Sequence, residues 1–589
     1  MTLQKELKKM KASDLIALKL SKYTDFVFSG QGGSVVHICD SIYKRKDIKL
    51  IPSQNEQGAS LAADAYTRTS GKLGVVVTTS GPGTINALQG LACSYYDSIP
   101  ALYFSGAPVL GALKKNKNLR QLGFQEMEMQ EIVKSFTKYS VRIVDVKKIY
   151  YEIEKCIFLA RNGRPGPCLI DLPDDIQRME TSEEEQEIFE PKNTKPTLES
   201  DKIIDSIKMI QESKRPLFVI GNGVKISKVE KDLEKLLKKT GIPYAPTWAA
   251  LDMFRTEDPK NIGTFGVYAT RYGNFIIQNS DLLIVLGSRL NTSLIGSNAK
   301  LFAPNAKKIL VDIDPAELEE ENGLKIDLKI NCDVRDFIES LNNKELKWEA
   351  NQEWYNKIKE LKTKYPIVKE EYFNQKKTVN PYVFFDTLSN YTQDNDIIIP
   401  DASANLVWTY QAYKVTKKQK IFTSLNHSPM GYSVAAAIGA SLGAKNNNII
   451  AIIGDGSMQM NIQELENIKS LKLPIKVFMI NNKGYGMVKQ TIDTWLDGNY
   501  VGCDEKSGLS LPDFQKVTRS YGIECVEINN NNDLKEKIEF TLNYKGPILC
   551  DVKLDPGEKI IPKVKAGSSI HKMLPELDEK EISSNMIKL

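Results

Sequence analysis

Short apolar runs alternate with helix-length stretches of mixed polarity along the whole chain. Nine of these runs have the length of a strand, and they cover residues 74–79, 101–106, 168–173, 217–221, 282–288, 307–314, 397–403, 449–456 and 475–482. Apolar strands separated by helices are typical of parallel sheets that helices cover on both faces. The pattern predicts an α/β fold with three doubly wound parallel-sheet domains, with ligands beyond the carboxyl ends of the strands.

Charged stretches without apolar periodicity divide the chain into blocks. Residues 181–200 are typical of a solvated linker, and residues 345–377 are either a second linker or an amphipathic helix. The pattern fades again after Pro562. We therefore expect domains at 1–180, 200–345 and 378–560, followed by a C-terminal tail or lid at 561–589.

Composition narrows the class of function. The 589 residues carry a net charge of only +5, which argues against a nucleic-acid partner, and no apolar run is long enough for a membrane span. The eight cysteines form no CxxC pair, and the charged start of the chain does not have the form of a signal peptide. We expect a cytoplasmic enzyme. Three histidines in all suggest that a cofactor supplies the difficult chemistry.

The third block carries the strongest chemical signal. One apolar run ends in Gly454-Asp455-Gly456, and the next ends in Asn481-Asn482, with 27 positions between Asp455 and Asn482. That interval fits one helix and one strand, so the two strand ends can lie side by side. Carboxylate and amide oxygens suit Mg²⁺, and a helix that begins near Ser457 would direct its free N–H groups at an anion. The pattern predicts a metal and phosphate site.

This arrangement resembles the diphosphate motif of thiamine-diphosphate-dependent enzymes, and the resemblance extends over almost the whole chain. It is closest to the large subunits of acetohydroxyacid (acetolactate) synthases. It implies a pyrimidine-binding first domain, a central domain similar to the synthase flavin domain, and a diphosphate-binding third domain. The implied metal ligands are Asp455, Asn482 and the main-chain oxygen of Gly484. The implied cofactor contacts are Ser403, Ala404, Asn405, Ser428, Met430, Gly454, Asp455, Gly456, Ser457, Asn482, Gly484, Tyr485, Gly486, Met487 and Val488.

Two residues have special roles in the resembling enzymes. The residue that matches Met430 lies beneath the cofactor and holds it in a V shape, a task that suits a large, conformable side chain. The residue that matches Glu56 hydrogen-bonds the pyrimidine ring and promotes loss of the reactive proton. Without the resemblance, Met430 would be read as a core residue and Glu56 as an acidic residue in the first turn of a helix.

The resemblance also bears on the reaction. Gln125 matches a synthase residue that handles substrate, and Gly33 lies in a glycine-rich loop in which Gly30 and Gln31 replace the usual Tyr-Pro. No His-His pair of the simple decarboxylases is present. We expect a transferase that decarboxylates pyruvate and joins the two-carbon unit to a second carbonyl substrate.

The sequence leaves open the acceptor and exact reaction, the presence of FAD, and the choice between dimer and tetramer. Thr491 replaces a synthase tryptophan, so the acceptor is either pyruvate or a larger compound such as a nucleotide-linked keto sugar. A pyruvate oxidase that uses FAD is the third reaction considered. FAD in the central domain is itself undecided, because residues 266–269 depart from the synthase pattern. Glu56 and Asp455 lie in separate domains, so the resemblance implies a homodimer or homotetramer.

Overall fold

The computed structural model describes residues 9–192, 195–319, 323–444 and 447–587. Three parallel sheets dominate it. The first has the strand order β3 (Lys49–Pro52), β2 (Phe26–Gly30), β4 (Gly74–Thr78), β5 (Ala101–Ala107), β7 (Pro167–Pro173) and β6 (Tyr139–Arg142). The second has the order β10 (Tyr244–Pro246), β9 (Pro216–Ile220), β11 (Leu282–Leu286), β12 (Lys307–Asp312) and β13 (Leu328–Asn331). The third has the order β15 (Lys420–Ile421), β14 (Ile397–Pro400), β16 (Ile449–Gly454), β17 (Lys476–Asn481), β19 (Ile548–Lys553) and β18 (Glu524–Ile528).

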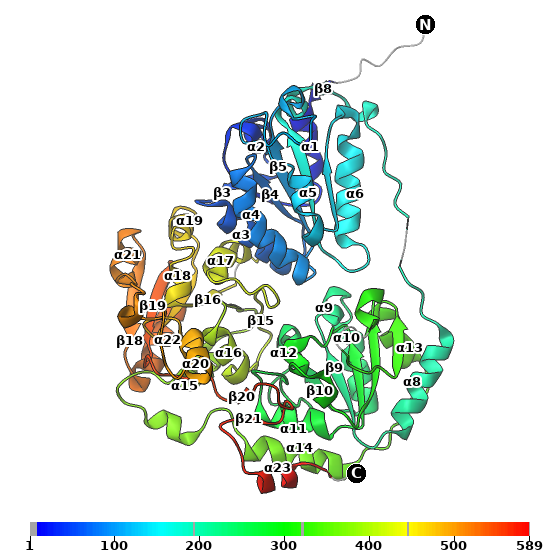
Figure 1. The fold of residues 1–589 in the computed structure, drawn as a ribbon, viewed down its shortest axis with the longest axis vertical. Coiled ribbons are helices and arrows are strands. Elements are labelled where there is room, and N and C mark those ends of the chain that lie inside the picture. Colours follow the sequence, from blue (N-terminus) through cyan, green and yellow to red (C-terminus); the bar gives the residue numbers. More distant parts are fainter. Residues whose placement is uncertain (1–8, 193–194, 320–322, 445–446, 588–589) are drawn as a thin grey trace.

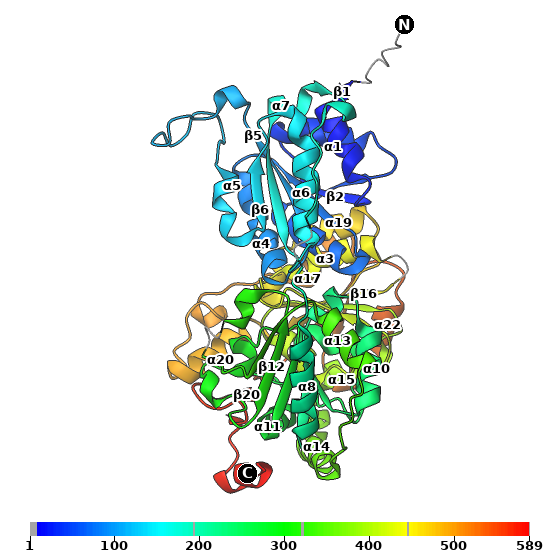
Figure 2. The same ribbon diagram turned by 90° about the vertical axis from the view of Figure 1, so that its right-hand side faces the viewer.

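All pairings within these sheets are parallel. Each of the nine predicted strand segments contains a strand, and the predicted α/β class with three doubly wound sheets is confirmed. The first domain lies above the other two, which stand beside each other (Figure 1). The view turned by 90° shows helices on both sides of the strands (Figure 2).

The stretch that was either a linker or a helix contains α14 (Gln352–Lys364). Trp354 on this helix is 1 % exposed, and Trp348 just before it is also buried. Both belong to the core of the central domain. This segment therefore contains an amphipathic helix, which packs against α11 (Arg271–Asn279) in the central domain.

The C-terminal segment packs against the central domain as well. It forms the short strands β20 (Lys563–Val564) and β21 (Met573–Leu574) and the helix α23 (Glu579–Asn585). Asn274 and Arg271 of α11 (Arg271–Asn279) donate hydrogen bonds to the carbonyls of Ile570 and Pro575. Since Ile570 and Ile582 also belong to the core of the central domain, residues 562–587 pack as part of that domain.

The first and third domains meet through two helices rich in small residues, α3 (Glu56–Ser70) and α17 (Tyr432–Gly443). Alanines fill much of their contact. At the closest point Gly439 faces the carbonyl oxygen of Ala62, and a Cβ on Gly439 would overlap that oxygen. The two backbones are therefore in direct contact.

We predict that Gly439→Ala destabilises the protein. The added methyl group meets backbone, which cannot rotate away, and overpacking of this kind costs roughly 1–3 kcal/mol. Chemical denaturation should show a lower unfolding midpoint. Ser441→Ala on the same helix is the control, because Ser441 is only half-buried, and it should unfold like the wild type. Equal midpoints for both variants would contradict the close contact.

Candidate functional site

The structure places Asp455 and Asn482 at neighbouring strand ends. β16 ends at Gly454 and pairs with β17, which ends at Asn481. Asp455 is 2 % exposed, and its two carboxylate oxygens accept hydrogen bonds from the amides of Gly456 (2.7 Å) and Gly484 (3.1 Å). Burial raises the pKa of Asp455 to about 6, although these hydrogen bonds oppose the shift. A cation beside it would favour the charged form.

The two loops of this site interlock. The ring of Tyr485 lies against Gly456, where any side chain would clash with it, and the amide of Asn482 lies equally close to Gly486. Gly484 has φ +145°, a conformation that favours glycine. Helix α20 (Gly486–Trp495) starts here and carries Met487, which is half-buried, and Val488, which is exposed. Packing thus requires glycine at 456, 484 and 486.

No group of three or more His, Cys, Asp or Glu side chains suited to a metal occurs in the described parts of the chain. The predicted ligands at Asp455, Asn482 and Gly484 are instead one carboxylate, one amide and one main-chain oxygen. Such a set fits Mg²⁺, which keeps several waters and takes further ligands from phosphates. It does not fit zinc, which prefers nitrogen and sulfur ligands.

The loop after β14 carries three of the predicted cofactor contacts. Ser403 has φ +71° and precedes α16 (Ala404–Ala412). The Nδ2 of Asn405 donates to the carbonyl of Ala402 (2.8 Å) and its Oδ1 accepts from the amide of Asp401 (3.2 Å), while its contact with the cofactor stays a prediction. The Asn405 side chain therefore shapes the loop itself.

Asp401 is a site residue that sequence reasoning missed. It is fully buried at the end of β14, and its carboxylate accepts hydrogen bonds from the amides of Gly431 (3.0 Å) and Ser433 (2.8 Å). These amides lie at the start of α17, directly after Met430. Burial raises the pKa of Asp401 to about 6. An aspartate that ends an apolar strand was the available signal. Ser428 (φ +50°) and Met430 lie in the loop that Asp401 holds.

The second half of the site lies in the first domain, around Glu56. Glu56 is the first residue of α3, and its Oε2 accepts a hydrogen bond from Asn86 (3.1 Å). A Cβ on Gly30 would overlap the Glu56 side chain, and one on Gly83 would lie 3.1 Å from its Oε1. Gly30, which replaces the usual tyrosine, therefore makes the space that Glu56 occupies.

Gln125 and Gly33 lie at this same edge. Gln125 has φ +57°, and its carbonyl oxygen would be 2.6 Å from a Cβ on Gly81, in the loop after β4. Gly33 begins a short 3-10 helix after β2, and no atom lies within 4 Å of the position its Cβ would take. Glu56, Gln125 and the Gly33 loop thus surround the ends of β2 and β4. The hydrogen bond from Asn86 to Glu56 lies within the first domain.

The central domain uses its strand ends for contacts within the protein. Gly221 and Gly223, after β9, pack against the backbone of Gly287, after β11. Arg289 donates to Asn426 of the third domain (2.6 Å), and Asp314 pairs with Arg164 of the first (3.0 Å). The segments that matched the synthase flavin domain therefore also join the three domains.

Comparison with known proteins agrees with this architecture. The family described as thiamine pyrophosphate enzyme matches in three parts, with the N-terminal TPP binding domain at residues 10–132, the central domain at 203–341 and the C-terminal TPP binding domain at 401–552. Acetolactate synthase 1, chloroplastic, of Nicotiana tabacum is 31 % identical over 583 residues, which cover 96 % of this chain and 85 % of the relative. The acetolactate synthase large subunits of Porphyra purpurea (32 % over 563 residues, 93 % and 92 % covered) and Lactococcus lactis subsp. lactis (31 % over 557 residues, 93 % of each) are also similar.

The chain belongs to the thiamine pyrophosphate enzyme family. Its similarity to acetolactate synthases over nearly its full length makes it a thiamine-diphosphate-dependent carboligase of the acetolactate synthase type. Among the described residues, none of the helices combines the length and the apolar character that crossing a membrane requires.

Glu464 joins the third domain to the first, close to Glu56. It lies on α19 (Glu464–Ser470), is fully buried, accepts a hydrogen bond from Asn467 (2.8 Å), and lies against Gly58 of α3, where a Cβ would overlap its carboxylate. Burial raises the pKa of Glu464 from its ordinary 4.5 to about 7. The folded chain therefore holds a proton that the unfolded chain releases at lower pH.

We predict that Glu464 makes stability fall as pH rises through this range. The loss begins near 4.5, the pKa of the unfolded chain, and is complete above about 7, the pKa of the folded chain. Glu464→Gln cannot ionise, so it should gain up to about 3 kcal/mol relative to wild type between pH about 5 and about 8. Unfolding midpoints measured across this range test it. Glu466→Gln, an exposed position on the same helix, should follow the wild-type curve.

Proposed function

We propose that this carboligase uses thiamine diphosphate with Mg²⁺, and that pyruvate is its donor substrate. The observation that carries the metal proposal is the interlocked pair of loops around the buried carboxyl of Asp455. Asp455, Asn482 and the carbonyl of Gly484 would hold Mg²⁺, which in turn would hold the diphosphate. The relatives named acetolactate synthase support pyruvate as the donor.

Each half of the site has its own task in this proposal. Thiamine diphosphate, when bound, supplies the carbon nucleophile that allows pyruvate to lose CO₂. Glu56 would hydrogen-bond the pyrimidine ring, and Met430 would support the cofactor from below. Ser403, Ala404, Ser428, Ser457, Tyr485, Met487 and Val488 would line the cofactor pocket, with the glycines 454, 456 and 486 leaving room for it. Gln125 and Gly33 would contact the substrates.

The reaction proposed breaks the bond between the carboxyl and carbonyl carbons of pyruvate and releases CO₂. The remaining two-carbon unit then forms a carbon–carbon bond with the carbonyl carbon of an acceptor. We propose a second pyruvate as the acceptor, which gives 2-acetolactate. Thr491 is exposed on α20, and its hydroxyl donates to the carbonyl of Met487 (2.9 Å). This small side chain would leave space for the acceptor substrate where the synthases have a tryptophan.

A homodimer or homotetramer is part of the same proposal. Exposed apolar side chains lie beside both halves of the site: Phe124 (86 % exposed) and Leu122 next to Gln125, and Trp495 and Val488 on α20. A second copy that covered them would bring Glu56 of one chain to the diphosphate half of the other. Sedimentation at dilute concentration should show a dimer or tetramer. The cytoplasmic location remains a prediction.

FAD in the central domain is a separate and narrower proposal. It rests on the resemblance of the central domain to the synthase flavin domain, because the amides of Gly221, Gly223 and Gly287 already donate to the carbonyls of Leu286, Gly287 and Val311. Arg289 is already engaged by Asn426. Purified protein that holds FAD would be yellow and would release a fluorescent flavin on denaturation; colourless protein with full carboligase activity would contradict a need for it.

Product analysis tests the reaction. With thiamine diphosphate, Mg²⁺ and pyruvate alone, we expect CO₂ and 2-acetolactate in equal amounts, without oxygen uptake. Glu56→Gln should bind the cofactor like the wild type but turn over about 100-fold more slowly or worse, because a proton-transfer group is lost. Release of CO₂ without acetolactate, followed by product with a larger carbonyl compound, would identify a specialised acceptor. Oxygen uptake would identify an oxidase.

Cofactor titration tests the metal site. Asp455→Ala should weaken Mg²⁺ and thiamine diphosphate binding together by at least about 100-fold, since even groups behind a metal ligand are worth about 10–100-fold. Asp455→Asn keeps the size and one oxygen but loses the charge, so its affinity should lie between those of Asp455→Ala and the wild type. Wild-type cofactor affinity in Asp455→Ala would show that the metal lies elsewhere.

A further inference from the structure

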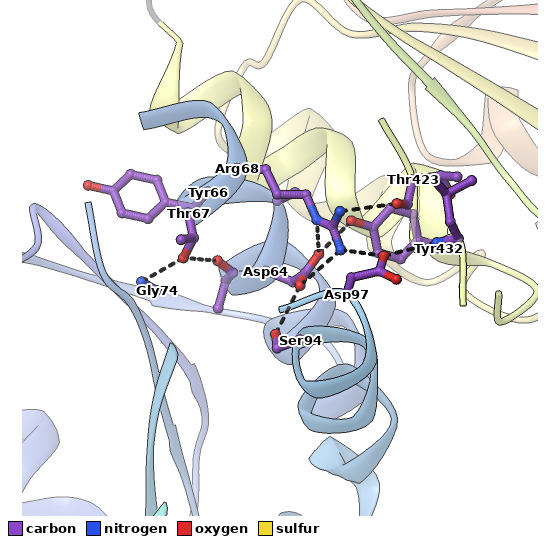
Figure 3. Close-up of polar contacts among 12 residues, drawn as sticks. Asp64, Tyr66, Thr67, Arg68, Gly74, Ser94, Asp97, Thr423 and Tyr432 are labelled. Carbon is purple, nitrogen blue, oxygen red and sulfur yellow. Dashed lines mark hydrogen bonds and ion pairs between the residues drawn. The ribbon is translucent and has the colours of Figure 1, made fainter. Parts of the chain in front are cut away.

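A cluster of buried charges joins the first domain to the third (Figure 3). Arg68 on α3 pairs with Asp64 one turn earlier (2.7 Å) and with Asp97 at the end of α4 (Pro82–Tyr96) (2.8 Å). Its Nη1 donates to the carbonyl of Thr423 (3.1 Å). Tyr432, the first residue of α17, donates its hydroxyl to Asp64 (2.6 Å).

The charges in this cluster compensate each other. Asp64 is fully buried, and the side chains of Asp97 and Arg68 are 4 % and 10 % exposed. Burial works against the charge of Arg68, but Asp64, Tyr432 and Asp97 together raise its pKa well above the ordinary value. Burial also raises the pKa of Tyr432, so its hydroxyl stays protonated and donates. Removing the arginine would leave two carboxylates without their cation.

The cluster forms hydrogen bonds with the N-terminal end of the segment Thr423–Tyr432, which we call the Met430 segment. Asp97 accepts hydrogen bonds from the amides of Leu425 (2.9 Å) and Asn426 (3.1 Å) and from Asn426 Nδ2 (2.7 Å). Arg68 holds its first carbonyl, at Thr423. All of these groups of the first domain bind backbone or side-chain atoms of the third domain.

The other end of the Met430 segment is held from within the third domain. Asp401 binds the amides of Gly431 and Ser433. The central domain adds hydrogen bonds to Asn426 from Arg289 (2.6 Å) and Asn291 (3.2 Å). Between these anchors, His427 stacks on Tyr96 with ring centroids 5.8 Å apart. Ser428 and Met430 thus lie on a short length of chain that is fixed at both ends.

We propose that Arg68 and Asp97 are positioning residues for the cofactor. From the first domain they fix the conformation of the Met430 segment, and this conformation sets the position of the Met430 side chain relative to thiamine diphosphate. This inference rests on the proposed role of Met430. A chain segment with φ +50° at Ser428 and φ +85° at Gly431 does not keep such a shape without external support. Arg68 supplies it because its planar fork reaches both carboxylates and the carbonyl together.

Hydrogen exchange and cofactor titration on the full-length protein test the proposal. Asn426→Ala removes the side-chain bonds to Asp97, Arg289 and Asn291 from an exposed position, so it should fold normally. We expect the amides of the Met430 segment to exchange about tenfold faster, and thiamine diphosphate with Mg²⁺ to bind about tenfold more weakly, at an unchanged unfolding temperature. Arg68→Met should have larger effects in the same direction, and Arg68→Lys, which keeps the charge without the fork, smaller ones.

A matched control is the buried pair of Arg142 and Asp171 in the same domain (2.6 Å). Arg142→Met should lower the unfolding temperature but leave exchange in the Met430 segment at the wild-type rate. Unchanged exchange in Asn426→Ala and Arg68→Lys would overturn the proposal, as would faster exchange with wild-type cofactor affinity. If the wild type bound no thiamine diphosphate, the proposed function would fail instead, and the exchange rates would still decide whether the cluster holds the segment.

Discussion

The backbone contact between Ala62 on α3 and Gly439 on α17 sets the distance between the first and third domains. Each of these helices begins at a predicted site residue or directly beside one: α3 starts with Glu56, and α17 follows Met430 and Gly431. Because atoms in direct contact leave no space for sliding, the packing of two helices determines where both site segments lie. The alanine-rich sequences of both helices allow this close packing, and the positions of the predicted site residues depend on it.

Buried carboxyl groups are stabilised in this molecule either by an ion pair or by hydrogen bonds from backbone amides. Asp64 and Asp97 share Arg68, so their charge is compensated inside the protein. Asp455 and Asp401 accept hydrogen bonds from backbone amides instead, and no ion pair of either is found among the described residues; burial raises the pKa of both to about 6. The compensated acids join domains. The others lie at the ends of adjacent strands, where Asp455 can take a cation as its partner and Asp401 fixes a loop.

Local patterns in the sequence were sufficient for the α/β class, for nine strands of the three parallel sheets and for the neighbouring strand ends of Asp455 and Asn482, because strand period and spacing are local properties. They could not identify Asp401 as the anchor of Gly431, nor Glu464 or Asp97, since these contacts join residues from 30 to more than 300 positions apart. For Asn405 the resemblance predicts a cofactor contact, and the structure adds hydrogen bonds that hold its own loop, which its residue type alone does not indicate. Gly30 departs from the synthase pattern, and only the position of Glu56 explains it.

The central domain affects the site without belonging to either half of it. Arg289 holds Asn426 at the base of the Met430 segment. Gln490 on α20 exchanges two hydrogen bonds with the backbone of Ile560 (2.9 and 3.0 Å), and the chain beyond Ile560 packs on the central domain. Both the loop of Met430 and the helix of Met487 are therefore tied to the same domain. A domain that anchors two predicted walls of the cofactor pocket contributes to the shape of that pocket with or without a flavin.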